Sequence, residues 1–230
     1  MDFLMTADFW IGLVKIVWIN IILSGDNAVV IALAARSLPP QQQRMAILWG
    51  SGAAVVLRIA LTVVAAHLLA LSYLQIVGGL LLLWIGVQLL AEEEEEEETG
   101  EQENKGLMAA VRTILIADLV MSLDNVIAVA AAAKGSDLLL ILGLAISIPL
   151  VIFGSTLMIK LMERFPIIVT LGAGLIGWVG GETIASDMVL KPWVEGNGWL
   201  HYAAAAVGAV LVIVIGKLLG ARAARQEHTA

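Results

Sequence analysis

The chain has 230 residues, of which 60% are hydrophobic and 14% are charged, and its formal net charge is −7. Soluble domains average about 45–50% apolar and about 25% charged residues, so this composition excludes an ordinary soluble fold and indicates a protein of the lipid bilayer. The run Glu92–Glu98 accounts for most of the net charge, and no basic patch suggests a nucleic-acid partner. The chain has no cysteine, which excludes disulfides and thiolate metal sites.

Long apolar runs predict an all-α membrane protein with a single transmembrane domain, 1–230. The interval from Leu138 to Ile159 contains no charged residue, and the interval from Met45 to Leu90 contains only Arg58. A membrane-spanning helix needs roughly 20 residues, so the second interval must hold two helices. We predict seven transmembrane helices at 9–35, 45–66, 70–91, 107–133, 137–159, 165–185 and 200–219, with an acidic linker at 92–106.

Basic residues in the short connections predict the orientation in the membrane. The side with more Lys and Arg is expected to be cytoplasmic, which places the N-terminus outside and both the acidic linker and the C-terminus inside. The cytoplasmic set is Arg36, Arg44, Lys105, Arg112, Lys160, Arg164, Lys217, Arg222 and Arg225, against Lys15, Lys134 and Lys191 on the outer side.

A four-residue motif occurs twice, and it indicates an internal repeat. Ser24-Gly-Asp-Asn27 recurs as Ser122-Leu-Asp-Asn125, a shift of 98 residues that also aligns the second predicted span with the fifth and the third with the sixth. Repeat one is 9–91, repeat two is 107–185, and 200–219 is an extra helix. Because each unit has three helices, the second unit lies upside down, and an inverted 3+3 repeat is a common transporter plan with its site near the midplane.

The two motifs are expected at the same depth. Asp26 lies ten residues before Arg36, and Asp124 lies ten residues before Lys134. At about 1.5 Å per residue this is about 15 Å, half of a roughly 30 Å hydrocarbon core. Gly25 is expected to loosen the first helix at this point, whereas the matching position in the second motif is a leucine.

The side chains of both motifs predict an all-oxygen cation site. Carboxylate, amide and hydroxyl oxygens suit a hard divalent ion such as Mn²⁺, Mg²⁺ or Ca²⁺, and several membrane carboxylates would repel each other without a cation. The alternative is that the Ser and Asn side chains only hydrogen-bond neighbouring helices. The candidate ligands are Asp26, Asn27, Asp118, Asp124, Asn125, Asn20, Ser24 and Ser122.

Three other charged residues lie in or near the predicted spans. Arg58, in the second span, is expected to form an ion pair with one of the membrane aspartates, with a structural or gating role. Glu182 and Asp187, near the outer end of the sixth span, are expected to be solvated carboxylates or to line an exit path.

The segments from Leu23 to Ala32 and from Asp118 to Ala128 resemble the paired motifs of the TerC family of bacterial integral membrane proteins. The small size and the acidic central loop are similar to its YjbE-type branch. The resemblance implies a multi-pass protein of the bacterial plasma membrane that exports Mn²⁺, with Asp26, Asp118 and Asp124 as the acidic centre. One departure is that Asn20 stands in the first copy where the second has Asp118.

The sequence therefore predicts a secondary transporter, not an enzyme, that exports a divalent cation, with return of protons as a plausible driving force. Mn²⁺ is expected as substrate, and no cofactor is expected. Three alternatives stay open: export of another small solute such as an amino acid, a scaffold or metal-loading partner of secreted proteins, and an intramembrane aspartyl protease. The sequence also leaves open whether the chain forms a homo-oligomer.

Overall fold

The computed structural model describes residues 7–23, 25–68, 71–99, 106–133 and 136–227, and every regular element in these ranges is an α-helix. This confirms the all-α prediction. Several helices extend past the predicted apolar spans, because a helix need not end where the bilayer ends. The helices are α1 (Ala7–Leu23), α2 (Gly25–Ala35), α3 (Pro40–Leu68), α4 (Leu74–Thr99), α5 (Leu107–Ala133), α6 (Asp137–Arg164), α7 (Ile167–Ala185), α8 (Lys191–Glu195) and α9 (Trp199–Glu227).

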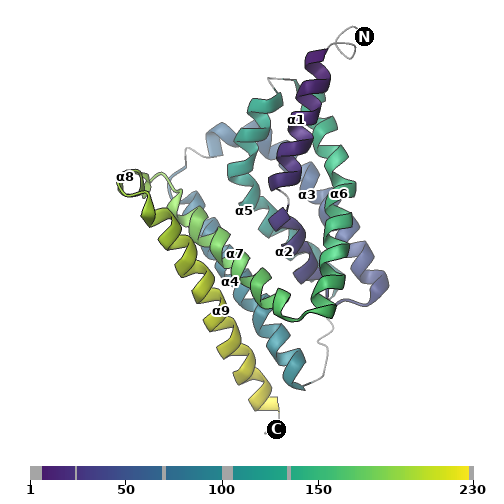
Figure 1. The fold of residues 1–230 in the computed structure, drawn as a ribbon, viewed down its shortest axis with the longest axis vertical. Coiled ribbons are helices and arrows are strands. Elements are labelled where there is room, and N and C mark those ends of the chain that lie inside the picture. The colour runs from purple at the N-terminus through teal and green to yellow at the C-terminus, as the bar shows by residue number, and fades with distance from the viewer. Residues whose placement is uncertain (1–6, 24, 69–70, 100–105, 134–135, 228–230) are drawn as a thin grey trace.

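The helices form two packed groups (Figure 1). In the first group α4, α7 and α9 lie side by side, and each contacts the other two. In the second group α3 packs mainly on α5, and α6 packs on α1 and α2. Contacts of α2 with α7 and of α5 with α4 join the groups. The start of α1 and the end of α9 lie at opposite ends of the molecule (Figure 1).

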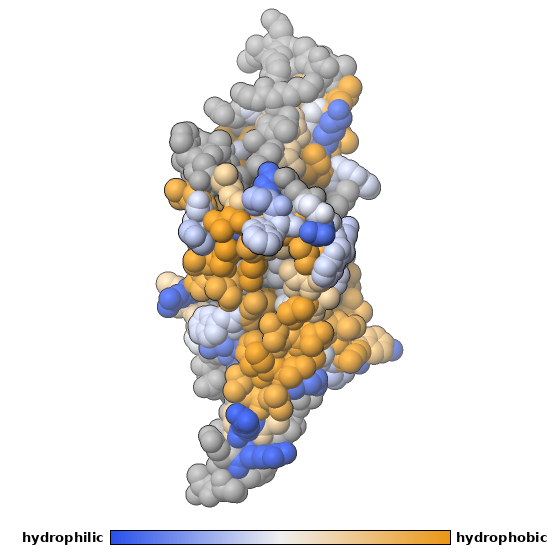
Figure 2. All heavy atoms as spheres, turned by 90° about the vertical axis from the view of Figure 1, so that its left-hand side faces the viewer, coloured by the Kyte–Doolittle hydropathy of each residue, from blue (hydrophilic) through white to orange (hydrophobic). Residues whose placement is uncertain are grey.

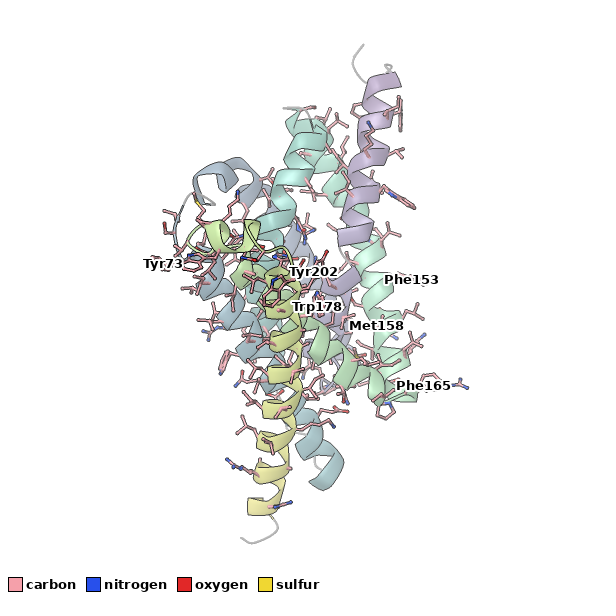
Figure 3. All side chains as sticks on the ribbon, turned by 60° about the vertical axis from the view of Figure 1, so that its left-hand side comes forward. Tyr73, Phe153, Met158, Phe165, Trp178 and Tyr202 are labelled. Atoms are coloured by element: carbon pink, nitrogen blue, oxygen red, sulfur yellow. The ribbon has the colours of Figure 1, made fainter. Side chains whose placement is uncertain are left out.

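In the described part of the chain, five helices are long and apolar enough to cross a membrane. Their outward surfaces carry large apolar side chains, such as the exposed Phe153 of α6, which is labelled in Figure 3. Figure 2 shows hydrophobic side chains over much of the face that carries α9, with hydrophilic residues gathered at its lower end. Such a surface suits lipid, not water. The five segments are Pro40–Thr62, Leu74–Glu93, Leu138–Arg164, Ile167–Ala185 and Trp199–Ala223.

Aromatic side chains gather around α8, at the end of the α4, α7 and α9 group where α9 begins (Figure 1). Trp193 on α8 and Trp199 at the start of α9 are both exposed. Figure 3 shows Tyr73 and Tyr202 at about the same height as the short helix α8. Trp and Tyr prefer the boundary between lipid and water, so these residues are positioned to mark one membrane interface.

The predicted first span is divided into two helices. α1 ends at Leu23 and α2 begins at Gly25, while Ser24 lies outside the described residues. α5 runs without a break through the second motif. All residues of α2 from Asn27 onward are buried, so its backbone is surrounded by protein.

Glycine and alanine residues bring α7 and α9 into close contact. A Cβ added at Gly181 would lie 2.1 Å from the carbonyl oxygen of Ala204, and one added at Gly208 would lie 2.2 Å from that of Gly177. Small residues let membrane helices approach until their backbones touch, which maximises van der Waals contact. On another side of α7, a Cβ added at Gly180 would lie 3.0 Å from the carbonyl oxygen of Gly79 in α4.

Asp187, which follows α7, is a buried helix cap. Its carboxylate is 1% exposed and accepts hydrogen bonds from the backbone N–H groups of Tyr73, Gln75 and Ile76 at the start of α4, at 3.2, 3.1 and 3.2 Å. The N–H of Val189 also donates, at 3.0 Å. Burial opposes ionisation, but the four donors outweigh it and hold the pKa of Asp187 below its ordinary value.

The expectation that Asp187 is a solvated carboxylate was therefore wrong. The sequence places it far from the start of α4, and only the packing of α4 on α7 brings them together. Glu182 is part-exposed, as expected, and its Oε1 lies 3.1 Å from Nε2 of His201 on α9.

Replacement of Gly181 by alanine should destabilise the protein, because α9 must shift to admit the new Cβ. We expect the free energy of unfolding to fall by about 1–3 kcal/mol. Gly52→Ala on α3 is the matched control, since its added Cβ meets no atom within 4 Å. Thermal unfolding of the purified proteins in detergent measures both. Equal unfolding temperatures for the two variants would contradict the close approach of α7 and α9.

Asp187→Ala should lower the free energy of unfolding by about 2–4 kcal/mol, because it leaves backbone N–H groups at the start of α4 without an acceptor. The pH dependence has a definite sign. Because the pKa of Asp187 is lower in the folded protein, its stabilisation is complete above about pH 4 and is lost as the pH falls further. Asp187→Asn should reduce this loss of stability at low pH, whereas Glu163→Gln, at an exposed carboxylate, should not. Unfolding temperatures between pH 3 and pH 6 provide the measurement.

Candidate functional site

A small cavity lies between α2, α3, α5 and α6, and its volume is about 20 Å³. This space is sufficient for a water molecule or a small ion. Aliphatic side chains form much of its wall. The polar side chains that line it are Asn27, Ser51, Arg58, Asp118 and Ser147.

Arg58 of α3 and Asp118 of α5 form a buried ion pair in the cavity wall. Arg58 Nη2 lies 2.5 Å from Asp118 Oδ1, and the two residues are 5% and 6% exposed. Ser122, one turn further along α5, donates to Asp118 Oδ2 at 3.2 Å. Each carboxylate oxygen therefore has a donor, as a charge in an apolar interior requires. The expected pairing of Arg58 with a membrane aspartate is confirmed.

Ser51 lies two helical turns before Arg58, on the same face of α3. It is 2% exposed, and its hydroxyl has no hydrogen-bond partner among the described residues. An unsatisfied buried hydroxyl costs about 1–3 kcal/mol, and native proteins contain few of them. The Ser51 oxygen is therefore available to a water molecule or an ion in the cavity.

A second carboxylate, that of Asp26, lies beside the lining residue Asn27. Asp26 occupies the first turn of α2, where free N–H groups and the helix dipole favour an acidic residue. The backbone N–H of Asn27 donates to Asp26 Oδ1 at 2.8 Å. Asn27 itself is buried and lines the cavity. The Asp26 carboxylate lies within electrostatic range of both Arg58 and Asp118.

The structure thus brings together four of the predicted ligands. Asn27 and Asp118 line the cavity, and Asp26 and Ser122 bond directly to these two residues. Asn125 is half-buried on α5, one turn beyond Ser122, and is not among the cavity-lining residues.

The other predicted ligands cannot be placed in the same way. Ser24 lies outside the described residues. The backbones of Asn20 and Asp124 belong to α1 and α5, but their side chains lie outside the described part of the chain. Among the described residues, no three Asp, Glu, His or Cys side chains come close enough to hold a metal ion.

Two cavity residues, Ser51 and Ser147, were missed by the sequence analysis. Ser147 is 1% exposed, and its hydroxyl donates to the carbonyl oxygen of Leu144 at 2.6 Å. Both are single serines in long apolar spans, outside the repeated motif. A signal was present for Ser51, because its spacing from Arg58 places the two side chains on one face of a helix.

These features define a helical integral membrane protein with a charged, polar cavity enclosed by its helices. The chain belongs to the TerC family: the profile described as "Integral membrane protein TerC family" matches residues 5–224. The resemblance seen in the paired motifs is thereby confirmed.

Several curated bacterial proteins are similar to this chain. The "Uncharacterized membrane protein YjbE" of Bacillus subtilis is 44% identical over 84% of this chain and 88% of its own length. The B. subtilis protein YkoY is 25% identical over 78% of this chain and 61% of its own length. The "UPF0053 inner membrane protein YoaE" of Escherichia coli K12 is 26% identical over 94% of this chain, which is 44% of that longer protein. No solved structure gives a significant match.

Removal of the Ser51 hydroxyl should not harm the fold. Because this hydroxyl has no partner among the described residues, Ser51→Ala should leave the free energy of unfolding unchanged or raise it by up to about 1 kcal/mol. Ser122→Ala removes a hydrogen-bond donor to Asp118 and should lower the free energy of unfolding. Thermal unfolding of both variants tests this contrast. A clear loss of stability in Ser51→Ala would show that the hydroxyl is bonded within the fold.

Proposed function

We propose that this protein is a secondary transporter that exports a divalent cation, with Mn²⁺ the expected substrate, through the cavity between α2, α3, α5 and α6. The observation that carries the proposal is a cavity lined by the Asp118 carboxylate and several neutral oxygens. A second carboxylate, that of Asp26, bonds to the lining residue Asn27, and the Ser51 hydroxyl in the cavity has no partner among the described residues. The cation is the substrate, so no bound cofactor is required.

The donor chemistry supports a hard cation. Asp118, Asp26, Asn27 and Ser51 offer carboxylate, amide and hydroxyl oxygens, which Mn²⁺, Mg²⁺ and Ca²⁺ accept. The absence of cysteine from the sequence argues against ions that prefer thiolates. Asp124, Asn125, Asn20, Ser24 and Ser122 remain candidate ligands, to be recruited in other states of the transport cycle.

Helix packing supports a transport cycle based on inverted repeats. If α1–α2, α3 and α4 correspond to α5, α6 and α7, then the contact of α3 with α5 should have a counterpart between α6 and α1–α2. Both contacts are present, and the corresponding helices α4 and α7 also pack on each other. We therefore propose seven spans, with α1 and α2 forming the first as a broken helix and α9 forming the extra one. Broken helices at repeat interfaces are common in secondary transporters.

We propose a location in the bacterial inner membrane, with the N-terminus outside and the C-terminus in the cytoplasm. The charge bias of the loops supports the orientation. The similar protein YoaE is named an inner membrane protein, which supports the location. The driving force is proposed to be proton antiport, since carboxylates that release a cation can accept a proton in its place.

A second candidate is export of an anionic or zwitterionic solute, and the presence of Arg58 in the cavity is the observation that favours it. The guanidinium already bonds to Asp118, however, so its charge is not available to a carboxylate substrate in this conformation. A metal-loading partner of secreted proteins is a third candidate, and it predicts co-purification of partners without cation flux.

The proposal is tested with the purified protein in liposomes that contain a Mn²⁺ indicator and a pH indicator. Wild type should transport Mn²⁺ with opposite movement of protons. Asp118→Asn and Asp26→Asn should each reduce the initial rate by at least about tenfold, because metal sites lose this much or more when ligand chemistry is altered. Ser51→Ala should weaken apparent affinity with little change in stability.

Glu163→Gln is the matched control, since it also neutralises one carboxylate but at an exposed position on α6. Parallel assays with Mg²⁺, Ca²⁺ and a set of amino acids define the substrate class. Amino-acid transport without Mn²⁺ transport, or equal Mn²⁺ rates for wild type and both aspartate variants, would refute the proposal.

A further inference from the structure

The two partners of the buried ion pair are both exceptions to the internal repeat. The shift of 98 residues that aligns Ser24 with Ser122 sets Asp118 against Asn20 and Arg58 against Thr156. The negative Asp118 of repeat two and the positive Arg58 of repeat one are thus both aligned with neutral residues. In the folded chain these two exceptions bond to each other, with Arg58 Nη2 2.5 Å from Asp118 Oδ1.

The position corresponding to Arg58 makes a different contact. The hydroxyl of Thr156 donates to the carbonyl oxygen of Ile152 within its own helix, at 2.8 Å, and Thr156 is exposed. Thr156 therefore makes no charged bond between helices, whereas Arg58 ties α3 to α5. The first repeat thus has an ion pair to a neighbouring helix at position 58, and the second repeat has none at the corresponding position 156.

We propose that Arg58 is an internal counter-ion that the transported cation must displace from Asp118. This inference rests on the proposed function and deepens it. Asp118 is the only described carboxylate that lines the cavity, and the guanidinium occupies one of its two oxygens while Ser122 donates to the other. A cation that approaches Asp118 from the cavity therefore competes with Arg58 for the Oδ1 oxygen.

An arginine suits this role because its side chain stays protonated at all relevant pH values. The empty site therefore keeps Asp118 neutralised by a fixed charge, and the carboxylate is not left bare in the apolar interior. A small divalent ion concentrates more charge near the carboxylate than a guanidinium does, whereas a monovalent ion offers no such advantage. Competition with Arg58 thus selects divalent over monovalent cations.

The cavity supplies a second, independent sign of a ligand. The Ser51 hydroxyl, on the same face of α3 as Arg58, is 2% exposed and lacks a partner among the described residues. A cation that displaces Arg58 from Asp118 would find this oxygen in the same cavity. Its arrival would also remove the bond between α3 and α5, so site occupancy and the α3–α5 contact become linked.

The test is equilibrium Mn²⁺ binding to the purified full-length protein in nanodiscs, followed by the electron paramagnetic resonance signal of free Mn²⁺. Arg58→Gln removes the group that competes with Mn²⁺ for Asp118. The dissociation constant for Mn²⁺ should fall by at least about tenfold, as expected when even a weak competing interaction is lost. The same variant should transport Mn²⁺ more slowly, because release is no longer assisted, and should lose preference for Mn²⁺ over Na⁺.

Arg36→Gln is the matched control, because it breaks a different ion pair, that with Glu93, beyond the end of α2 and outside the cavity. Its affinity should equal that of wild type. Should Arg58→Gln fail to fold, Arg58→Lys serves instead, since lysine lacks the planar fork that fits a carboxylate, and its affinity should lie above that of wild type.

Unchanged or weaker Mn²⁺ binding by a folded Arg58→Gln, or weaker binding by Arg58→Lys, would overturn the counter-ion role while leaving the proposed transport intact. Failure of the wild type to bind Mn²⁺ at all would overturn both proposals.

Discussion

A charge inside a membrane protein has no bulk water to stabilise it, and this constraint organises the second helix group. Asp118 requires donors on both oxygens, and it obtains them from Arg58 on a neighbouring helix and from Ser122 on its own helix. The pair fixes α3 against α5 at the level of the cavity. It also sets the electrostatic conditions for Asp26, which lies within electrostatic range of both groups.

The two helix groups are held together by different physical means. Between α7 and α9 the backbones touch through glycine and alanine, which leaves little freedom for the helices to slide. The group of α1, α2, α3, α5 and α6 instead encloses a cavity, an ion pair and an unsatisfied hydroxyl. The first group is thus packed closely through small residues, whereas the second contains a polar cavity that its own side chains do not fill.

Much of the architecture was predictable from the sequence because apolar length alone defines a membrane helix. The structure begins and ends α5 at the predicted residues 107 and 133. The repeat identified Asp118 and Asn27, which share the cavity. Ser51 was missed because its significance lies in a buried hydroxyl without a hydrogen-bond partner among the described residues, which only the folded structure reveals. Asp187 was misjudged because its partners lie more than a hundred residues earlier in the chain.

The glycine face of α7 also constrains how the chain is assembled during synthesis. α9 follows α7 in the sequence, so the residues that cover Gly177 and Gly181 enter the bilayer after α7 does. Until then this side of α7 presents bare backbone to lipid, with little side chain to shield it. The packing of the first group of helices can therefore be completed only once α9 has been inserted.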